Sequence, residues 1–594
     1  MRKPMEPSPF GASPALSPFL NALLREWNGW EFITGVPTGL FRPRADVLRL
    51  NFPASRCAVL VEARHRSKVG YHDFAMPLLR LRPDGEATEI DLFSLLALIL
   101  EEPGIAGRAT PKSRMTFLRR SLASIAAIGE VSAARGEIRP FAEGDPDFIE
   151  AESALRFGHA VHPAPMSREE FTHVDSERFG HEYGNDFTLR WWAVDPSILA
   201  SGSVEPLNVV DMARKLAAGD PQLLTRAARE YGKVLVPMHP WQTLRLMQEE
   251  RIERLFRDGR IVDLGLGGPA WRATTSLRTI HSSRTDWMLK FSLSLRLTNS
   301  RRIVEEHECR RGLSVHRLVK GKLGEALRKR CPTLTVLGEP AWFGLRDEDG
   351  SLMTDTIVSF RENPFRGEDS PSAVVLGALC ERHPGRTESH LSDLVNRIAR
   401  DEKKPVEDVA RLWFERFLAT AIEPFIVAFS EFGLLFGAHQ QNLVVGLAGG
   451  WPDALYFRDC QGTGYVEEFL PKLRQFLPEA GQKGDHVFPA PAAAKLFGYY
   501  LIVNGAFATI AALAAAGLVK EDGLLAIFRH SLERLAKQPM ADRTCLDYLL
   551  NAPTLAAKGN FLIALRNINE NTEVTDPLAG YVELPNPLLV REHA

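Results

Sequence analysis

The chain has 594 residues, which is long enough for two to four domains of ordinary size. Its hydrophobic content of 45% and its charged content of 25% are typical of globular proteins and exclude wholesale disorder. The formal net charge of −2 excludes a bulk attraction to nucleic acid or to acidic membranes, so we expect neither as a partner.

Three features bear on the cellular compartment. The six cysteines are dispersed without a CxxC spacing, which indicates reduced, mostly buried thiols in a chain of this length. The N-terminus is rich in proline and lacks an apolar segment, so no secretory signal is predicted. The alanine-rich segment 501–519 carries Asn504 and Thr509, and we interpret it as a buried helix rather than a membrane span. We therefore expect a cytoplasmic protein.

The chain divides into three expected domains, at residues 1–148, 149–370 and 371–594. The first mixes strand-like runs at 57–62 and 76–81 with a helix at 91–101, and the turn-forming sequence that starts at Gly144 marks its end. The second alternates polar motifs with short strands and ends in a polar stretch that starts at Arg361. The third is rich in predicted helices and contains one hairpin.

In the second domain, a polar motif follows a predicted buried strand. Residues 234–238 are apolar, Pro240 stands where the first residue of a helix would, and helical periodicity continues over 243–256. His239 and Gln242 therefore flank a strand-to-helix turn, a usual place for ligand-binding groups. The alternative, that His239 only caps the helix and its neighbours only pack, is equally open.

Residues 290–298 alternate strictly between polar and apolar side chains, which predicts one β-strand. The apolar face fixes the register, because a slip of one residue would bury the charges. The polar face carries Lys290, Ser292, Ser294, Arg296 and Thr298. Taken alone, such a face is also typical of the solvated side of an antiparallel sheet.

Another polar segment precedes this strand. Thr274, Ser276 and Arg278 fall on one face if the segment is extended, and we expect it to lie beside residues 290–298. Arg offers a bidentate contact to phosphate and Lys a point charge. With Arg302 just beyond the strand, the combined cluster predicts a site for a polyanion.

The third domain contains a predicted β-hairpin. Apolar runs at 442–446 and 454–458 are joined by a loop with adjacent glycines. This register places Asn442 roughly opposite Arg458. The polar residues expected to converge at the open end are His439, Gln441, Asn442 and Asp459. An amide oxygen beside a carboxylate suits a magnesium ion that bridges phosphate oxygens, and a plain polar hairpin end is the alternative.

The hairpin is also similar to the metal-binding part of a protein kinase, in which an Asn ends the catalytic loop and an Asp follows one hairpin later. Here no aspartate precedes Asn442, since His439 and Gln440 occupy that neighbourhood. The chain has neither a P-loop nor a nucleotide-covering glycine loop. A kinase-like phosphotransferase is therefore the second hypothesis.

Seven motifs, in order, resemble those of one enzyme family. The first, Gly158-His159-Ala-Val-His162-Pro163 with Arg168 and Phe171, resembles the GHPxHPxxKxRxGF signature of the NRPS-independent siderophore (NIS) synthetases, the aerobactin-synthetase IucA/IucC-like family. The others are His239-Pro-Trp-Gln242, Ser276-Leu-Arg278-Thr279, Thr298-Asn299-Ser-Arg-Arg302, Arg361-Glu-Asn-Pro364, Ala438-His439-Gln-Gln441-Asn442 and Arg458-Asp459. The similarity spans residues 150 to 460.

This resemblance implies an α+β enzyme with thumb, fingers and palm domains, antiparallel sheets and a helix-rich C-terminal palm, with the site in the fingers–palm cleft. It implies adenylation of a polycarboxylate, typically citrate or a citryl derivative, with ATP and Mg²⁺ as cofactors. An amine or a hydroxyl then displaces AMP to give an amide or an ester. A homodimer is also suggested by the resemblance alone.

The resemblance further implies roles for single residues. The expected ATP-binding residues are Ser276, Arg278, Thr279, Lys290, His159, His162 and Gln441. The expected substrate-binding residues are Arg302, Thr298, Asn299, His439 and Arg361, and the expected magnesium ligands are Asp459, Asn442 and Gln441. Catalysis is expected from His439, Arg302 and Lys290. For His159 and His162 a purely structural turn is the alternative.

The chain departs from the family pattern at four positions. The family's second-position Pro, its Lys and its Gly fall at Ala160, Met166 and Glu170, and the Glu before Ala-His is Gly437. None of these changes removes the expected phosphate site, so we expect an active enzyme. An inert homologue that binds citrate or a siderophore is a further hypothesis. Free citrate is the first expectation for the acid, before a citryl monoamide or 2-oxoglutarate, and the nucleophile is left open.

Overall fold

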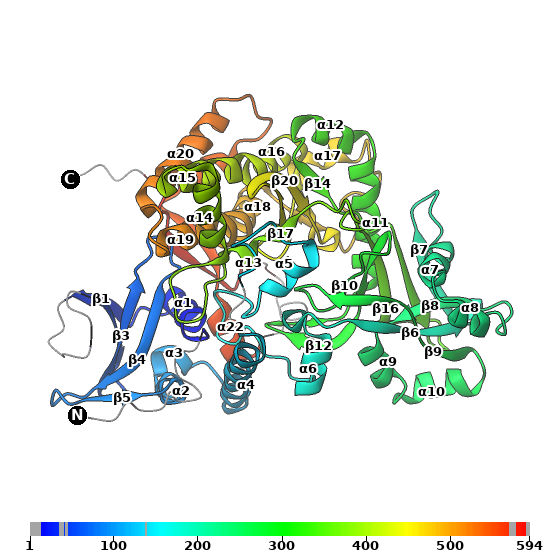
Figure 1. The fold of residues 1–594 in the computed structure, drawn as a ribbon, viewed down its shortest axis with the longest axis horizontal. Helices are drawn as coiled ribbons and strands as arrows, with labels where there is room; N and C mark the ends of the chain where they lie inside the picture. Colours follow the sequence, from blue (N-terminus) through cyan, green and yellow to red (C-terminus); the bar gives the residue numbers. More distant parts are fainter. Residues whose placement is uncertain are drawn as a thin grey trace.

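The computed structural model describes residues 14–34, 41, 45–136, 139–568, 576 and 578–589. It combines helices with mainly antiparallel sheets, which confirms the expected α+β class (Figure 1). In this view the N-terminal sheet lies at one end, the largest sheet at the other, and the C-terminal helices above and between them.

A five-stranded antiparallel meander forms the N-terminal part. Its strands are β1 (Trp30–Thr34), β2 (Asp46–Phe52), β3 (Cys57–His65), β4 (Asp73–Leu81) and β5 (Ala87–Ile90). The runs predicted at 57–62 and 76–81 lie in β3 and β4, and the predicted helix is α2 (Leu92–Glu101), which Asp91 caps by accepting the Ser94 N–H. The other helices here are α1 (Leu16–Glu26), α3 (Pro103–Ala106) and α4 (Pro111–Arg135).

An eight-stranded antiparallel sheet forms the middle part. In spatial order its strands are β7 (Leu199–Ser203), β15 (Ala341–Arg346), β16 (Leu352–Glu362), β11 (Trp287–Phe291), β10 (Thr279–His281), β9 (Ile261–Ala273), β6 (Phe187–Val194) and β8 (Val234–Met238). The surrounding helices are α5 (Phe148–Ala154), α6 (His173–Phe179), α7 (Val209–Ala217), α8 (Pro221–Ala227), α9 (Pro240–Leu246), α10 (Glu250–Arg257), α11 (Glu306–Lys320) and α12 (Lys322–Arg330).

The single strand predicted at 290–298 is wrong, because the chain leaves the sheet at Ser292. Strand β11 ends at Phe291, and β12 (Leu293–Leu297) pairs instead with β13 (Ser300–Arg302) in a separate two-stranded sheet. The break is held by the Ser292 hydroxyl, which donates to the Thr354 carbonyl and accepts the Val304 N–H. Thr354 is distant in sequence and Val304 lies beyond the next strand pair, so local alternation could not reveal them.

The helix predicted at 243–256 is also interrupted. Helix α9 ends at Leu246, and α10 begins at Glu250. The start is as predicted: β8 leads directly into His239, whose Nδ1 accepts the Trp241 N–H as the helix cap.

The C-terminal part combines small sheets with most of the remaining helices. The four-stranded sheet contains β14 (Leu334–Val336), β20 (Trp451–Phe457), β19 (Leu443–Ala448) and β17 (Ala373–Val375). The others contain β18 (Leu434–Leu435), β21 (Gly464–Val466) and β22 (His486–Phe488), and β23 (Thr554–Lys558) with β24 (Tyr581–Pro585). The helices are α13 (Leu376–Cys380), α14 (His390–Glu402), α15 (Val406–Phe417), α16 (Glu423–Phe432), α17 (Leu470–Leu473), α18 (Ala490–Phe497), α19 (Phe507–Ala515), α20 (Glu521–Ala536), α21 (Thr544–Asn551) and α22 (Asn560–Arg566).

The hairpin predicted in the third domain is confirmed as β19 and β20. Leu443 pairs with Phe457, and the Arg458 N–H donates to the Asn442 carbonyl at 3.2 Å, so these two residues are opposite each other as expected. The connection is a two-residue turn, Gly449-Gly450, with φ of 57° and 83°. Positive φ at both positions is the geometry that makes glycine the preferred residue in such a turn.

The alanine-rich segment is a buried helix, as predicted. Helices α18 and α19 are joined by a π-helical stretch, η6 (Gly498–Ala506), into one continuous helix from Ala490 to Ala515. It is long and apolar enough to cross a membrane, but 94% of its most apolar window is buried inside the protein. A core helix passes the same test of length and composition, so this segment is weak evidence for a membrane span.

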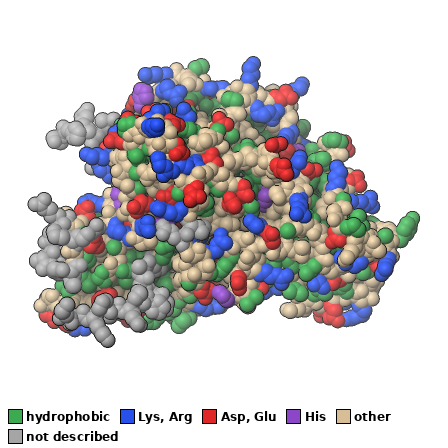
Figure 2. All heavy atoms as spheres, in the orientation of Figure 1, with side chains coloured by type: hydrophobic (Ala, Val, Ile, Leu, Met, Phe, Trp, Pro, Cys, Tyr) green, Lys and Arg blue, Asp and Glu red, His purple; other side chains and the backbone are tan. Residues whose placement is uncertain are grey.

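Two large cores underlie this arrangement. One joins the N-terminal meander to the C-terminal helices, and the other fills the faces of the eight-stranded sheet. On the surface, Figure 2 shows Lys and Arg side chains interspersed with Asp and Glu, in keeping with a net charge close to zero.

The hairpin turn offers a direct test of the packing. An alanine in the left-handed region costs about 1–2 kcal/mol at either glycine. At Gly450 an added Cβ would also lie 2.8 Å from Arg397 Nη2 and 2.9 Å from Ile398 Cδ1, whereas at Gly449 it would meet open space. We therefore expect Gly450→Ala to lower the Tm clearly more than Gly449→Ala, and equal Tm values would contradict this packing.

Candidate active site

A buried ion pair joins the eight-stranded sheet to the C-terminal hairpin. Lys290, on β11, is 2% exposed, and its Nζ lies 2.6 Å from Oδ1 of Asp459, which directly follows Arg458 at the end of β20. On its other side the same ammonium lies 3.5 Å from Oε1 of Glu339, and Arg361 binds that oxygen through Nε at 3.0 Å. The four charges alternate in sign, which is how buried charges are tolerated.

The pKa of Asp459 reflects this surrounding charge. Burial raises the pKa, but Lys290, Arg361 and Arg278 together hold it well below its usual range, so the side chain is a carboxylate. Its backbone has φ 85°, a left-handed conformation that is uncommon for a residue other than glycine. Such strain is tolerated where surrounding contacts fix the residue, and it is frequent at functional sites.

The predicted phosphate-binding segment is a turn and not an extended strand, which corrects the expectation for Thr274, Ser276 and Arg278. Leu277 has φ 61°, and the Ser276 hydroxyl accepts the Thr279 N–H at 3.1 Å. The turn brings hydroxyls together, with Thr274 Oγ1 and Ser276 Oγ 3.3 Å apart. Local hydrogen bonds of this kind compete with extended structure and cannot be distinguished from it by alternation.

The expected neighbourhood of this segment and Lys290 is confirmed. Thr279 begins β10 and pairs directly with Lys290 on β11. Among the described residues, Oγ1 of Thr279 is a buried polar atom without a hydrogen-bond partner. An orphaned hydroxyl beside a buried ammonium is a suitable contact for an anionic oxygen.

Glu152 is a site residue that the sequence did not reveal. It is fully buried on α5 and binds both Nη atoms of Arg458, at 2.7 and 3.2 Å. The same carboxylate accepts the Thr275 N–H at 2.7 Å, and Arg458 Nη2 donates to the Thr275 hydroxyl at 2.8 Å. The pair therefore ties the phosphate-binding turn to the hairpin. No signal in the sequence distinguished Glu152 from Glu150 on the same helix.

His439 and Asn442, before the hairpin, lie together as expected, whereas Gln441 contacts this region through its backbone. Asn442 donates to the Gly437 carbonyl at 2.9 Å, and its Nδ2 lies 3.2 Å from His439 Nε2. The Gln441 carbonyl accepts a bond from Arg458 Nε. Burial lowers the pKa of His439 to about 4, with Asp459 opposing the shift and Arg302 adding to it, so the imidazole is neutral at pH 7.

Among the predicted substrate-binding residues at 298–302, Arg302 and Asn299 have described links to other predicted site residues. Arg302 is half-buried on β13 and lies close enough to act on the pKa of His439. Thr298 adopts φ 51°, and Asn299 Oδ1 lies 3.3 Å from His162 Nε2. This contact connects the first motif of the sequence to the fourth.

The first motif is divided between a buried and an exposed histidine. His162 is 2% exposed, and its Nδ1 accepts the Ala164 N–H, which fixes the turn. His159 is exposed to solvent, although the protein around it lowers its pKa, with further contributions from His162 and His439. His162 therefore fixes the turn, and His159 is the member of the pair that is exposed.

Two predicted residues are held by contacts inside the protein. His239 is buried among Phe179, Phe187 and Phe291 and caps α9, so the structure shows the alternative in which it is structural. Arg361 binds Glu339 and also helps to lower the pKa of Asp459, and its expected role in substrate binding stays a prediction.

Two of the positions that depart from the family pattern have clear surroundings. Met166, which replaces the family's Lys, is 4% exposed and belongs to the core shared with the N-terminal meander. Gly437, which replaces the family's Glu, has only the Gly462 carbonyl within 4 Å of a Cβ added there. Neither residue interrupts the ion pairs described above.

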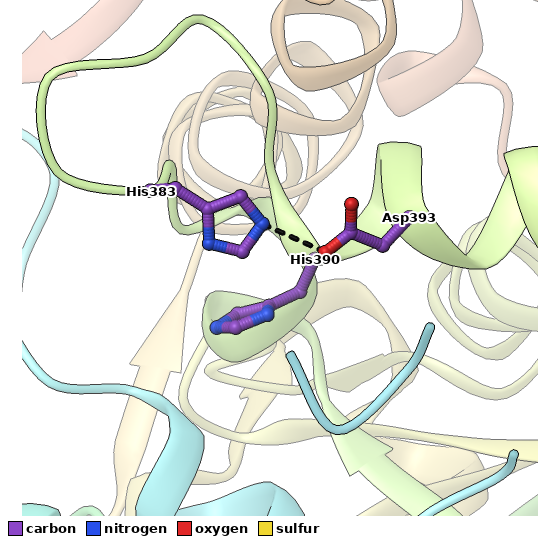
Figure 3. Close-up of side chains that lie close together, drawn as sticks. All are labelled: His383, His390 and Asp393. Atoms are coloured by element: carbon purple, nitrogen blue, oxygen red, sulfur yellow. Dashed lines mark hydrogen bonds and ion pairs between the residues drawn. The ribbon is translucent and has the colours of Figure 1, made fainter. Parts of the chain in front are cut away.

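A second cluster of possible metal ligands lies outside this site. His383, His390 and Asp393 place their donor atoms within 4.8 Å of one another, and Figure 3 shows His383 and Asp393 directed toward each other, with the His390 ring below them. His383 Nε2 already binds Asp393 Oδ2 at 2.8 Å, and Arg139 donates to the other oxygen. Because both carboxylate oxygens are engaged, we interpret the cluster as the anchor of a loop to α14.

Two protein-family models and several known proteins match this chain. The model of the IucA / IucC family matches residues 147–381, and that of the ferric iron reductase FhuF-like transporter matches residues 411–573. Two similar relatives are N(2)-citryl-N(6)-acetyl-N(6)-hydroxylysine synthases. That of Vibrio mimicus is 32% identical over 97% of this chain and 95% of its own length, and that of Escherichia coli is 34% identical over 97% of each chain.

A solved structure matches the fold over nearly its whole length. It is that of ATP-bound aerobactin synthetase IucA from a hypervirulent pathotype of Klebsiella pneumoniae, with a TM-score of 0.89 and 32% identity. The alignment covers 98% of this chain and all of that one.

The variant Glu152→Ala tests whether the ion pair between Glu152 and Arg458 stabilises the protein. In Glu152→Ala, Arg458 would be left buried without its partner, and we expect a loss of about 3–5 kcal/mol in the free energy of unfolding. The control is Glu150→Ala, an exposed glutamate on the same helix, which is expected to change stability by about 0.5 kcal/mol or less. Denaturant titration measures both, and similar small effects would contradict the assigned role.

Proposed function

The chain belongs to the IucA/IucC family of NIS siderophore synthetases, and on this premise we propose that it uses ATP to activate citrate and joins the acid to an amine. The observation that carries the proposal is the junction of Lys290 and Asp459, where the phosphate-binding turn and the hairpin meet. The class of acid and of amine is inferred from the names of the relatives. The binding of the nucleotide is inferred from the residues of the site.

For the nucleotide, we assign the triphosphate to the turn and its neighbouring strand. Arg278 and Lys290 provide the positive charge, and Ser276 and Thr279 provide hydroxyls. We also assign His159, His162 and Gln441 to nucleotide binding, with the turn of His162 fixed by the bond from the Ala164 N–H to its Nδ1. Arg458 is already satisfied by Glu152, so we assign it to positioning.

The residues at the hairpin end fit a magnesium ion. Asp459 is a carboxylate with its side chain 28% exposed, and the amide nitrogen of Asn442 is bound to Gly437, which turns the amide oxygen the other way. Carboxylate and amide oxygens are the ligands that Mg²⁺ prefers, so these two residues would hold it, with Gln441 nearby. When bound, the ion would neutralise phosphate charge.

For the acid, we assign Arg302, with Thr298, Asn299 and His439 around it. A citrate carboxylate oxygen attacks the α-phosphorus of ATP, an O–P bond forms, and the bond to the departing pyrophosphate breaks. Arg278 and Arg302 would stabilise the added negative charge during this step. His439, neutral at pH 7, serves as a hydrogen-bonding group beside the acid.

In the second step an amine attacks the carbonyl carbon of the citryl adenylate. A C–N bond forms, the C–O bond to AMP breaks, and an N–H proton is released. Two relatives, 32% and 34% identical to this chain, are N(2)-citryl-N(6)-acetyl-N(6)-hydroxylysine synthases, and we propose an amine of the N(6)-acetyl-N(6)-hydroxylysine class here. We further propose that residues 1–148, 149–370 and 371–594 act as thumb, fingers and palm.

The nucleotide products test this proposal. With citrate, ATP, Mg²⁺ and an amine, we expect AMP and pyrophosphate in equal amounts, measured by anion-exchange chromatography. ADP in place of AMP would favour the kinase hypothesis. Citrate binding without turnover across a panel of amines would favour the inert homologue.

A matched pair of arginines tests the acid site. Arg301 and Arg302 are adjacent on β13, but Arg301 is exposed and Arg302 is half-buried beside the site. We expect Arg302→Ala to lower kcat/KM for citrate by about 10²–10³-fold, the usual effect of removing one charge-stabilising group. Arg301→Ala should stay close to the wild type. Equal losses in both variants would contradict the assignment of Arg302.

A further inference from the structure

The backbone that carries Asp459 needs support from its surroundings. Asp459 has φ 85°, and a residue other than glycine keeps such a conformation only where the surrounding structure fixes it. The chain then turns at once into a short 3₁₀ helix, η4 (Cys460–Gly462), in which the Gly462 N–H donates to the Asp459 carbonyl at 3.1 Å. The direction of the Asp459 carboxylate therefore depends on how η4 is held.

The two oxygens of this carboxylate have different neighbours. Oδ1 lies 2.6 Å from Lys290 Nζ. Oδ2 lies beside Gly462, because a Cβ added to Gly462 would be 3.1 Å from it. If Asp459 binds magnesium, Lys290 has to share the carboxylate with the ion, so this ion pair is weakened as a tether in the loaded state. A tether that acts on the backbone of η4 is not weakened in this way.

Arg311 supplies a tether of this kind. It is 1% exposed on α11, and its Nη1 donates to the Gln461 carbonyl in the middle of η4. Its Nη2 donates to the Gly484 carbonyl, and its Nη1 also lies 3.2 Å from Nδ1 of His486, where β22 begins. One guanidinium therefore joins two backbone segments, the turn after Asp459 and the loop before β22.

The guanidinium is well suited to this task. It presents several N–H donors in a fixed plane, so it can bind two carbonyls at once, whereas a lysine has a single nitrogen. Burial lowers the pKa of Arg311, and the acidic groups around it, Asp459 among them, oppose the shift. Arg311 is thus close enough to Asp459 for their charges to interact, although its hydrogen bonds go to the backbone of η4 and of the loop.

Helix α11 is itself fixed to both parts of the protein that form the site. Lys320, in its last turn, lies 2.7 Å from Glu362 at the end of β16, which is next to β11 in the eight-stranded sheet. Arg317 lies 3.0 Å from Glu479 in the C-terminal part. Figure 1 shows α11 between that sheet and the C-terminal part. Arg311 therefore ties η4 to a helix that is anchored on both sides.

We propose that Arg311 is a positioning residue for magnesium: it holds η4, and through it Asp459, so that Oδ2 is available to the ion while Oδ1 stays close to Lys290. The assignment rests on the proposed function, since it concerns the ion that accompanies ATP. Arg311 acts through Asp459 and not on the nucleotide. Its effect belongs to the binding of ATP with its metal and not to the binding of ATP alone.

The affinity for ATP with and without the metal tests this role. Isothermal titration calorimetry gives the Kd of ATP in excess Mg²⁺ and the Kd of ATP in EDTA, both without citrate. Arg311→Lys keeps the charge but loses the planar set of donors. We expect its Kd in Mg²⁺ to rise at least about 10-fold, the usual effect of losing a group that orients a metal ligand. Its Kd in EDTA should match that of the wild type.

Two further variants complete the test. Arg317→Ala is the matched control, because it removes a cation from the same helix whose partner, Glu479, lies outside η4. It should leave both Kd values unchanged. Gly462→Ala removes no buried charge, but its Cβ would press on Asp459 Oδ2, and we expect the Kd in Mg²⁺ to rise selectively here as well.

Each outcome decides a different point. If both Kd values of Arg311→Lys rise by the same factor, if neither changes, or if the variant does not fold, Arg311 only supports the fold and the proposal is wrong. An unchanged Kd in Mg²⁺ for Gly462→Ala would also overturn it. A wild type that binds ATP equally well in Mg²⁺ and in EDTA would overturn the magnesium assignment of Asp459. Tighter binding in Mg²⁺ without any citrate-dependent AMP would instead overturn the proposed function.

Discussion

The buried ion pair between Lys290 and Asp459 is the constraint on which the rest of the site depends. The lysine comes from the eight-stranded sheet and the aspartate from the end of the hairpin, so the pair fixes the position of one sheet relative to the other. Lys290, which is 2% exposed, could not be buried without a partner, because the desolvation of an unpaired charge is strongly unfavourable. Glu339 and Arg361 extend the alternation inward, and Asp459 keeps its left-handed backbone within this network.

A second buried pair, Arg458 with Glu152, acts beside the first. It binds the turn at Thr275 and the loop at Gln441, which are the two segments assigned to phosphate and to the acid. The consequence is a site whose charged groups are positioned before any substrate arrives. Preorganised charge of this kind is the largest contribution that many enzymes make to the transition state.

The sequence predicted those parts of the structure that depend on neighbouring residues. Alternation and adjacent glycines identified the hairpin and the opposition of Asn442 and Arg458, and the motif order identified the family. The break at Ser292 could not be predicted, because its hydroxyl bonds to Thr354 and Val304, which lie far along the chain or in another strand. Glu152 and Glu339 were missed for the same reason: only the folded chain shows which arginine or lysine a buried glutamate meets.

The central claim is that citrate is activated by attack on the α-phosphorus of ATP at this site. The most direct measurement is the transfer of ¹⁸O from carboxylate-labelled citrate during turnover with the amine, followed by mass spectrometry of the phosphorus-containing products. The account predicts one ¹⁸O in AMP and none in pyrophosphate. Label in inorganic phosphate together with ADP, or no label in AMP, would contradict it.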